Sequence, residues 1–407
     1  MNRMKQAEWI CLIVVGAMLV GSAGWTATLD DAKLDGGGGA VAALIDRVRA
    51  ASAQGAGSVE ARAARDALAT RGPEVLPALL DGMDTPDTVV ANWLRTAFDE
   101  VAARALKSNP SSLPTPQLRR FVLDASRQGR ARRLALELLT KLDSDASRKL
   151  IPPLLDDPEF RRDAVSATLD AAERALKEQK TDDALAAIAK AFDAARDADQ
   201  VRAAAAKLKS LGREVSIVEH LGFLVDWHIV GPFAGPDFKA FTNVYPPERQ
   251  LLAIDLAARY DGPRGKLAWK RHRTPDDFGT VDLVKSVEAT DDAAAYAFTA
   301  IDSPAARDAQ FRCGADDNLT IWLNGERVFA KDEWQNGTRL DRFIVPVRLR
   351  AGRNEILVKV CQGPKYRDPG MANPWSMQFR ICDASGKGIA IPASPVDVRQ
   401  ESCDEKE

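Results

Sequence analysis

Residues 311–329, FRCGADDNLTIWLNGERVF, decide the fold of the second half of this chain. Two β-rich runs flank Asn324-Gly325, the dipeptide best suited to the two positive-φ positions of a type I′ hairpin turn. If these two residues form the whole loop, the expected pairs are Leu323 with Glu326, Trp322 with Arg327 and Ile321 with Val328. One face then carries Leu319, Ile321, Leu323 and Val328, and the other carries Thr320, Trp322, Arg327 and Phe329. The first face is the expected core side.

More strands are expected on both sides of this hairpin. After Gly212 the composition changes from Ala/Leu patterns to aromatic and β-branched runs broken by Gly, Pro, Asn and Asp. The expected strands are 224–230, 267–271, 294–301, 309–313, 319–323, 327–330, 343–349, 355–361 and 376–382. Short strands separated by turn signals predict an antiparallel β-sandwich over residues 214–395.

The preceding part, residues 41–213, reads almost entirely as helices. Apolar residues recur at spacings of three and four residues, as on one face of a helix. Gly, Pro or Asp residues interrupt this pattern at intervals of about one helix length. Short helices with one apolar stripe cannot bury themselves alone, so they are expected to stack into a solenoid. The segments GPEVLPALL (72–80) and LIPPLLDDPEFRRDAV (150–165) resemble HEAT-type repeats. The predicted fold class is therefore multidomain α plus β, a HEAT-like helical solenoid followed by a β-sandwich.

The N-terminus has the pattern of a secretory signal. A basic start, Met1 to Lys5, precedes an uncharged run from Trp9 to Trp25 that ends in small residues. We expect a signal peptide at 1–23 and a flexible Gly-rich tether at 24–40. An uncleaved membrane anchor is the alternative, but the run is shorter than the roughly 20 residues that span a bilayer. The expected location is exported, periplasmic or extracellular, with no membrane span after cleavage.

Charge and length limit the remaining possibilities. A chain of 407 residues is too long for one small core, which favours more than one domain. The net charge of -2 gives no reason to expect nucleic acid as a partner, since that would require a basic surface. Residues 396–407 are strongly charged and are expected to form a disordered tail.

Two motifs of the sandwich carry a family resemblance. The runs CGADDNLTIWLNG (313–325) and LRAGRNEILVK (349–359) resemble a galactose-binding-like jelly roll. They are similar to the non-catalytic sandwich domain of family-2 glycoside hydrolases and to protective-antigen-type lectin domains. With WHIVGPF (227–233) and YPPE (245–248), the whole chain resembles a family of exported proteins from planctomycete-type bacteria that pair helical repeats with such a domain. The resemblance implies a fold and no particular activity.

Three consecutive oxygen-bearing side chains, Asp316, Asp317 and Asn318, form the candidate metal site. Hard cations such as calcium favour oxygen ligands. In protective-antigen-type lectins a matching Asp-Asp pair holds calcium that binds sugar hydroxyls, so the resemblance implies calcium here. The alternative is an Asx turn entering the strand, with the side chains capping backbone N–H groups.

Tryptophans are the candidate carbohydrate-binding residues. Trp334 and Trp375 lie in loop-like contexts, and Trp322 lies on the hairpin face away from the expected core. An exposed indole suits the apolar face of a sugar, although packing inside the protein is the commoner fate of Trp.

The cysteines offer one candidate disulfide. Removal of residues 1–23 leaves four cysteines, which allow three pairings in an oxidising compartment. Cys361 and Cys382 have the same parity in two alternating strands, so a bridge between them is conceivable if those strands pair.

Catalysis has little support in the sequence. The histidines, His220, His228 and His272, are not spaced as a metal motif, and the sequence contains no Gly-x-Ser-x-Gly, Cys-x-x-Cys or P-loop. We expect a non-catalytic binding protein whose sandwich recognises carbohydrate or a cell-envelope component and whose helices bind protein. The alternatives are a structural scaffold without a small-molecule site and, less favoured, a glycoside hydrolase-type enzyme with two carboxylates facing each other across a cleft.

Overall fold

The structure, a computed structural model, describes residues 37–50, 57–334, 337–364 and 373–391. The chain divides into two compact units, one ending at Pro114 and one beginning at Thr115. The predicted signal peptide and the predicted C-terminal tail lie outside the described residues. The first helix begins at Gly37, inside the range predicted as a tether.

The unit that ends at Pro114 consists of helices that pack in pairs. Asp87 caps the longest of them, because its carboxylate accepts hydrogen bonds from the backbone N–H groups of Val89 at 2.8 Å and Val90 at 3.3 Å. Helix α1 packs on α2, and α3 packs on α4. The helices are α1 (Gly37–Arg49), α2 (Ser58–Ala69), α3 (Leu76–Gly82) and α4 (Thr88–Ser108), with short 3-10 turns at Pro73–Val75 and Pro110–Ser112.

The second unit begins with further helices. They are α5 (Thr115–Leu123), α6 (Gly129–Leu142), α7 (Ala146–Leu150), α8 (Arg161–Lys177), α9 (Thr181–Ala194), α10 (Ala198–Ser210) and α11 (Ile217–Leu221). A buried ion pair holds the turn before α8. The Arg132 guanidinium lies 2.6 Å from the Asp157 carboxylate and also donates to the Val122 carbonyl. Asp157 in turn accepts from the N–H of Phe160, so the Asp-Pro turn of the repeat-like segment has a structural role.

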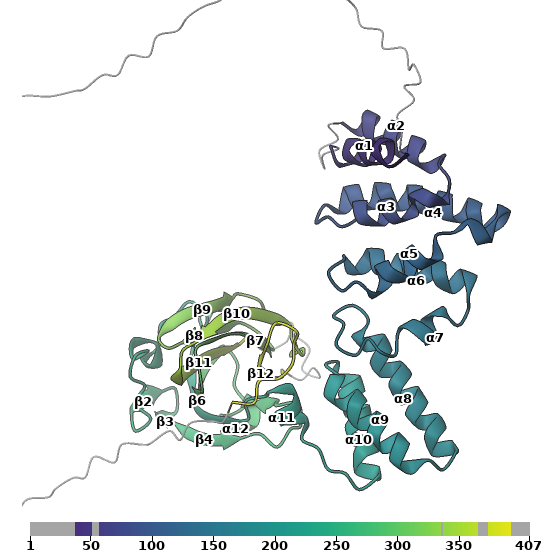
Figure 1. The fold of residues 1–407 in the computed structure, drawn as a ribbon. Coiled ribbons are helices and arrows are strands. Elements are labelled where there is room, and N and C mark those ends of the chain that lie inside the picture. Colours follow the sequence, from purple (N-terminus) through teal and green to yellow (C-terminus); the bar gives the residue numbers. More distant parts are fainter. Residues whose placement is uncertain (1–36, 51–56, 335–336, 365–372, 392–407) are drawn as a thin grey trace, which may run out of the picture. The chain divides into compact units, whose positions relative to one another are not determined.

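Most strands of the second unit form two antiparallel sheets that face each other as a β-sandwich (Figure 1), and two more form a separate small hairpin. The six-stranded sheet has the order β4-β1-β6-β11-β8-β9, and the four-stranded sheet has the order β10-β7-β12-β5. The bounds of the first sheet are β1 (Asp226–Ala234), β4 (Lys270–Arg273), β6 (Ala293–Ser303), β8 (Leu319–Leu323), β9 (Glu326–Lys331) and β11 (Gly352–Gln362). Those of the second are β5 (Val281–Asp282), β7 (Arg307–Ala315), β10 (Phe343–Leu349) and β12 (Ser376–Cys382).

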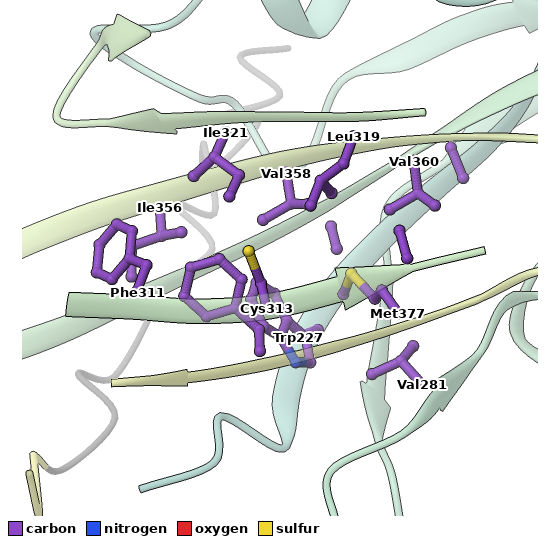
Figure 2. Close-up of a cluster of buried hydrophobic side chains, with 14 of the residues drawn as sticks. Trp227, Val281, Phe311, Cys313, Leu319, Ile321, Ile356, Val358, Val360 and Met377 are labelled. Atoms are coloured by element: carbon purple, nitrogen blue, oxygen red, sulfur yellow. The ribbon is translucent and has the colours of Figure 1, made fainter. Parts of the chain in front are cut away.

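The main core of the sandwich lies between the two sheets. Alternate residues of β11, Ile356, Val358 and Val360, point toward Phe311 of β7 and Met377 of β12 (Figure 2). All five side chains are buried. The period-two pattern predicted for residues 355–361 is thus confirmed, since one face of this strand forms the core.

The central hairpin confirms most of its predicted register. Asn324 and Gly325 have φ values of 54° and 85°, as a type I′ turn requires. Leu323 pairs with Glu326 and Trp322 with Arg327, but Ile321 pairs with Phe329. A register shift between Ile321 and Trp322 explains why the prediction was wrong beyond the second pair. Because of this shift, Phe329 packs against the main core instead of lying on the outer face.

A connecting segment between β1 and β6 covers the outer face of the six-stranded sheet. It contains the 3-10 turn η3 (Pro246–Arg249), the small hairpin β2 (Arg259–Gly262) and β3 (Gly265–Ala268), and continues through β4, β5 and α12 (Leu283–Ser286). Its aromatic residues Tyr260 and Trp269 pack on Phe298 and Trp322 of the sheet. This second apolar layer makes β6, β8 and β11 buried on both faces.

A buried lysine fastens this segment to the sheet. Lys359, in β11, is 1% exposed and lies 2.8 Å from the Glu248 carboxylate of the YPPE motif. Its ammonium also donates to the carbonyls of Phe241 and Asn243 at 3.1 and 2.6 Å. A buried charge is tolerated when it is paired and hydrogen-bonded in this way. The YPPE motif therefore has a structural role.

No helix in the described ranges is long and apolar enough to cross a membrane.

Candidate functional site

The candidate site lies at one end of the sandwich, around Gly363 just after β11. The Gly363 N–H donates to the Asp317 carboxylate at 2.7 Å, and its carbonyl accepts from the Asp292 N–H at 3.0 Å. A Cβ placed on Gly363 would lie 3.1 Å from Asp317 Oδ2 and 3.1 Å from Trp334 Cε3. A carboxylate and an indole ring thus approach the same glycine from two different loops.

An aromatic pair forms the exposed side of this end. The rings of Phe238 and Trp334 are 5.2 Å apart in an edge-to-face arrangement. Phe238 is 51% exposed and Trp334 is half-buried. The Phe238 N–H donates to the Asp292 carboxylate, which holds this residue next to Gly363.

The predicted metal ligands, Asp316, Asp317 and Asn318, are all buried between β7 and β8. Each binds another segment. Asp316 accepts from the Gly337 N–H, Asp317 accepts from the Gly363 N–H, and the Asn318 amide donates to the Asp332 carboxylate. The carboxylates therefore do cap backbone N–H groups, as the Asx-turn alternative proposed, but the N–H groups belong to distant residues.

Several buried polar atoms of this end have no hydrogen-bond partner among the residues that the structure describes. They are Asp292 Oδ1, Asp316 Oδ2, Asn318 Oδ1, Gln362 Oε1 and Trp375 Nε1. Buried polar groups are normally satisfied, so a cluster of acceptors without donors calls for an explanation. Four of the five atoms are oxygens, which makes this end of the sandwich rich in unused acceptors.

The electrostatics of the cluster are unfavourable to further negative charge. Burial, followed by the neighbouring charge of Asp317, raises the pKa of Asp316 from 3.8 to about 6. Burial and the charges of Asp291 and Asp237 raise the pKa of Asp292. A cation beside either carboxylate would stabilise its charged form and so lower the raised pKa.

The segment after Gly337 is held in place by a buried ion network. Arg380 of β12 is fully buried, and its Nε donates to Asp341 at 2.6 Å, while Arg312 of β7 lies 3.1 Å from the same carboxylate. This network fixes the loop that supplies the Gly337 N–H to Asp316.

Two of the predicted carbohydrate-binding tryptophans are inside the protein. Trp375 is 1% exposed in the main core, and Trp322 is 6% exposed beneath the layer formed by Tyr260 and Trp269. The expectation of exposed indole platforms is corrected for both residues, because the connecting segment covers the face of Trp322 and the sandwich core takes in Trp375. Trp334 alone of the three lies beside the carboxylates at a partly exposed position.

The candidate disulfide between Cys361 and Cys382 required their two strands to be neighbours in one sheet, and they are not. Cys361 lies in β11 of the six-stranded sheet and Cys382 in β12 of the four-stranded sheet. Both are buried free cysteines. Burial raises the pKa of the Cys361 thiol to about 12 and that of the Cys382 thiol to about 11. The structure corrects the prediction, since opposite sheets separate the two residues.

Within the described ranges, no group of three or more His, Cys, Asp and Glu side chains is arranged to hold a metal ion. The two carboxylates of the predicted calcium site are accompanied by amide oxygens of Asn318 and Gln362, which are also acceptable calcium ligands.

Sequence reasoning missed Phe238, Asp292, Asp332 and Gly363. Three of them lie far from the hairpin in sequence, so only the fold brings them together. The Gly-Pro pair at 363–364 was a usable signal, because such pairs mark turns at the ends of strands.

No protein-family model matches the chain, and no curated protein matches it. Among solved structures, an anti-sigma factor domain-containing protein matches with a TM-score of 0.25 and 14% identity, covering 42% of this chain and 46% of that one. A β-glucosidase from Kluyveromyces marxianus matches with a TM-score of 0.27 and 13% identity, covering 44% of this chain and 22% of that one. A family 35 carbohydrate-binding module from an environmental isolate matches with a TM-score of 0.18 and 21% identity, covering 25% of this chain and 72% of that one.

The chain spans less than half the length of the first two of these proteins. The similarities are weak, and no conclusion about function follows from them.

Proposed function

We propose that this chain is an exported, non-catalytic binding protein whose galactose-binding-like sandwich recognises carbohydrate at the end formed around Gly363. The observation that carries the proposal is the convergence of Trp334 and Asp317 on this glycine. Sugar recognition combines an aromatic surface for the apolar face of the ring with hydrogen-bonding groups for the hydroxyls. The Phe238–Trp334 pair and the unused acceptors supply both.

The helices have a separate role in this proposal. Stacked pairs such as α1 with α2 and α3 with α4 support a HEAT-like solenoid, and solenoids offer extended surfaces for protein partners. In this organisation residues 41–213 form the repeat domain and residues 214–395 the sandwich.

Calcium is an alternative occupant proposed for the same end of the sandwich. The unpartnered oxygens of Asp316 and Asn318 favour it, because a hard cation takes oxygen ligands. Thermal melting with calcium and with a chelator measures this directly, since a ligand of the folded state raises the Tm.

A structural scaffold is the second candidate function. The burial of Trp322 and Trp375 favours it, since both tryptophans serve the packing of the sandwich. Under this alternative the sandwich has no small-molecule ligand, and Trp334 and Phe238 only cover the end of the core.

Binding of soluble polysaccharides to the full chain separates the two candidates. We expect at least one neutral or amino polysaccharide to raise the Tm, and Trp334→Ala or Phe238→Ala to weaken its affinity about ten-fold, the loss of roughly 1.4 kcal/mol of stacking energy. Ile344→Ala is the matched control, because Ile344 is also 51% exposed but lies on β10. A panel without any binding, for a protein that melts cooperatively, supports the scaffold.

A further inference from the structure

The end of the sandwich around Gly363 gathers more carboxylates than its hydrogen bonds require. Asp292 and Asp316 are buried or half-buried beside Gly363 and Gly337, and Asp332 binds the Asn318 amide. Asp237 and Asp291 are exposed and close enough to Asp292 to raise its pKa.

These carboxylates are not neutralised within the described part of the chain. Asp237, Asp291, Asp292, Asp316 and Asp332 form no ion pair there, and Lys239, next to Phe238, pairs with none of them. The neighbouring Glu333 behaves differently, because it pairs with Lys331 at 2.9 Å and also with Arg342. The described groups therefore leave an excess of negative charge at this end.

The second observation is the set of buried acceptors without donors. Asn318 is fully buried and Gln362 is 1% exposed. Within the described ranges, however, Asn318 Oδ1, Gln362 Oε1 and Asp316 Oδ2 have no hydrogen-bond partner. Asn318 lies beside the end of β11, because the Cys361 N–H, one residue before Gln362, donates to the Asn318 carbonyl at 3.0 Å. Unused buried acceptors are satisfied by a ligand that brings N–H donors.

The aromatic pair distinguishes an organic cation from a metal ion. A bare divalent cation needs six to eight oxygen ligands and makes no use of an aromatic ring. An ammonium group carries three N–H donors and is attracted to the faces of Trp and Phe rings. Trp334 and Phe238 lie beside the carboxylates, so the surroundings match an ammonium group better than calcium.

We propose that the site selects saccharides that carry a free amino group, such as glucosamine units, over neutral or acidic sugars. This inference rests on the proposed carbohydrate-binding function and specifies its ligand class. The ammonium would meet the carboxylate of Asp292, which accepts a hydrogen bond from the Phe238 N–H, and the sugar ring would lie against Phe238 and Trp334. A uronate would be repelled by the carboxylates of Asp292, Asp291 and Asp237.

Calorimetric titration of the full chain near pH 6.5 tests this selectivity. The probes are a glucosamine tetrasaccharide, its fully N-acetylated counterpart, a galacturonic acid tetrasaccharide and calcium chloride. We expect the free amine to bind at least ten-fold more tightly than the N-acetylated form, with no binding of the uronate. Raising the salt concentration should weaken binding of the amine, because the attraction is electrostatic.

Variants locate the selectivity. Asp292→Asn should reduce affinity for the free amine about ten-fold and leave affinity for the N-acetylated form nearly unchanged. Asp308→Asn is the matched control, since Asp308 is an exposed carboxylate on β7 outside the cluster. A melting curve shows that each variant is folded.

The outcomes are distinguishable. Equal affinity for the free and N-acetylated forms overturns the amino-sugar inference while the proposed carbohydrate-binding function stands. Binding of calcium that is abolished by Asp316→Asn, with no preference for the amine, replaces the inference by a metal site. Absence of binding by all saccharides overturns both the inference and the proposed function.

Discussion

At the scale of single residues, burial of the Asp316 carboxylate carries a stability cost. Asp316 is 5% exposed, one of its carboxylate oxygens has no hydrogen-bond partner in the described part of the chain, and its neighbour Asp317 carries the same charge. The pKa of Asp316 is about 6 in the folded protein, compared with the ordinary value of 3.8. Between pH 3.8 and pH 6, therefore, the folded state keeps a proton on Asp316 that the unfolded state has lost. Stability therefore falls as the pH rises through this window.

Replacement of Asp316 by Asn should reverse this cost. We expect Asp316→Asn to be more stable than the parent by about 1 kcal/mol at pH 7 without ligand, since the variant has no charge to bury. The difference should shrink toward pH 4, where Asp316 itself is protonated. Urea denaturation from pH 4 to pH 8 measures both effects, with Asp308→Asn as the exposed control. A loss of stability at pH 7 would show that the Asp316 charge is compensated.

At the scale of elements, two asparagines connect the central hairpin to the turn between β10 and β11. The Asn324 amide donates to Asn354 Oδ1 at 3.0 Å, and Asn324 Oδ1 accepts from the Glu355 N–H at 2.9 Å. Asn354 is fully buried, and its amide donates to the carbonyls of Arg350 and Gly352. The two resemblance motifs, Asn-Gly and Gly-Arg-Asn, thus have a shared structural role.

Coupling between these asparagines can be measured. We expect Asn354→Ala to cost about 2 to 3 kcal/mol, because it leaves buried backbone groups unpaired. Asn324→Ala should cost about 1 kcal/mol, and the double variant should lose less than the sum. A double-mutant cycle by chemical denaturation gives the coupling energy. Strict additivity would mean that the two loops are stabilised independently.

The sequence predicted strands better than it predicted surfaces. Strands 319–323, 343–349 and 376–382 have the predicted bounds, because alternation of apolar residues and turn signals are local features. The fate of Trp322 was not local, since the segment that covers it lies more than fifty residues away in the chain. The site shows the same limit: Asp316 and Trp334 were identified from the sequence, whereas Phe238 and Asp292 reach them only through the fold.

At the scale of the whole molecule, the two compact units have separate buried cores. Leu76, Leu79 and Leu94 are buried in the unit that ends at Pro114, whereas Phe311 and Met377 belong to the core of the sandwich. Among the described residues, the helices α1 to α4 contribute none to this sandwich core. These helices therefore serve as the internal reference when ligand binding to the sandwich is measured on the full chain.

Hydrogen–deuterium exchange of the full chain, with and without a glucosamine tetrasaccharide, tests the central claim most directly. We expect slower exchange at residues 316–318, 332–334 and 362–363, because a ligand that binds the folded state suppresses local opening at its site. Helices α1 to α4 should be unchanged. Protection elsewhere on the sandwich, such as over residues 308–310 and 346–348, with no change around Gly363, would contradict the claim.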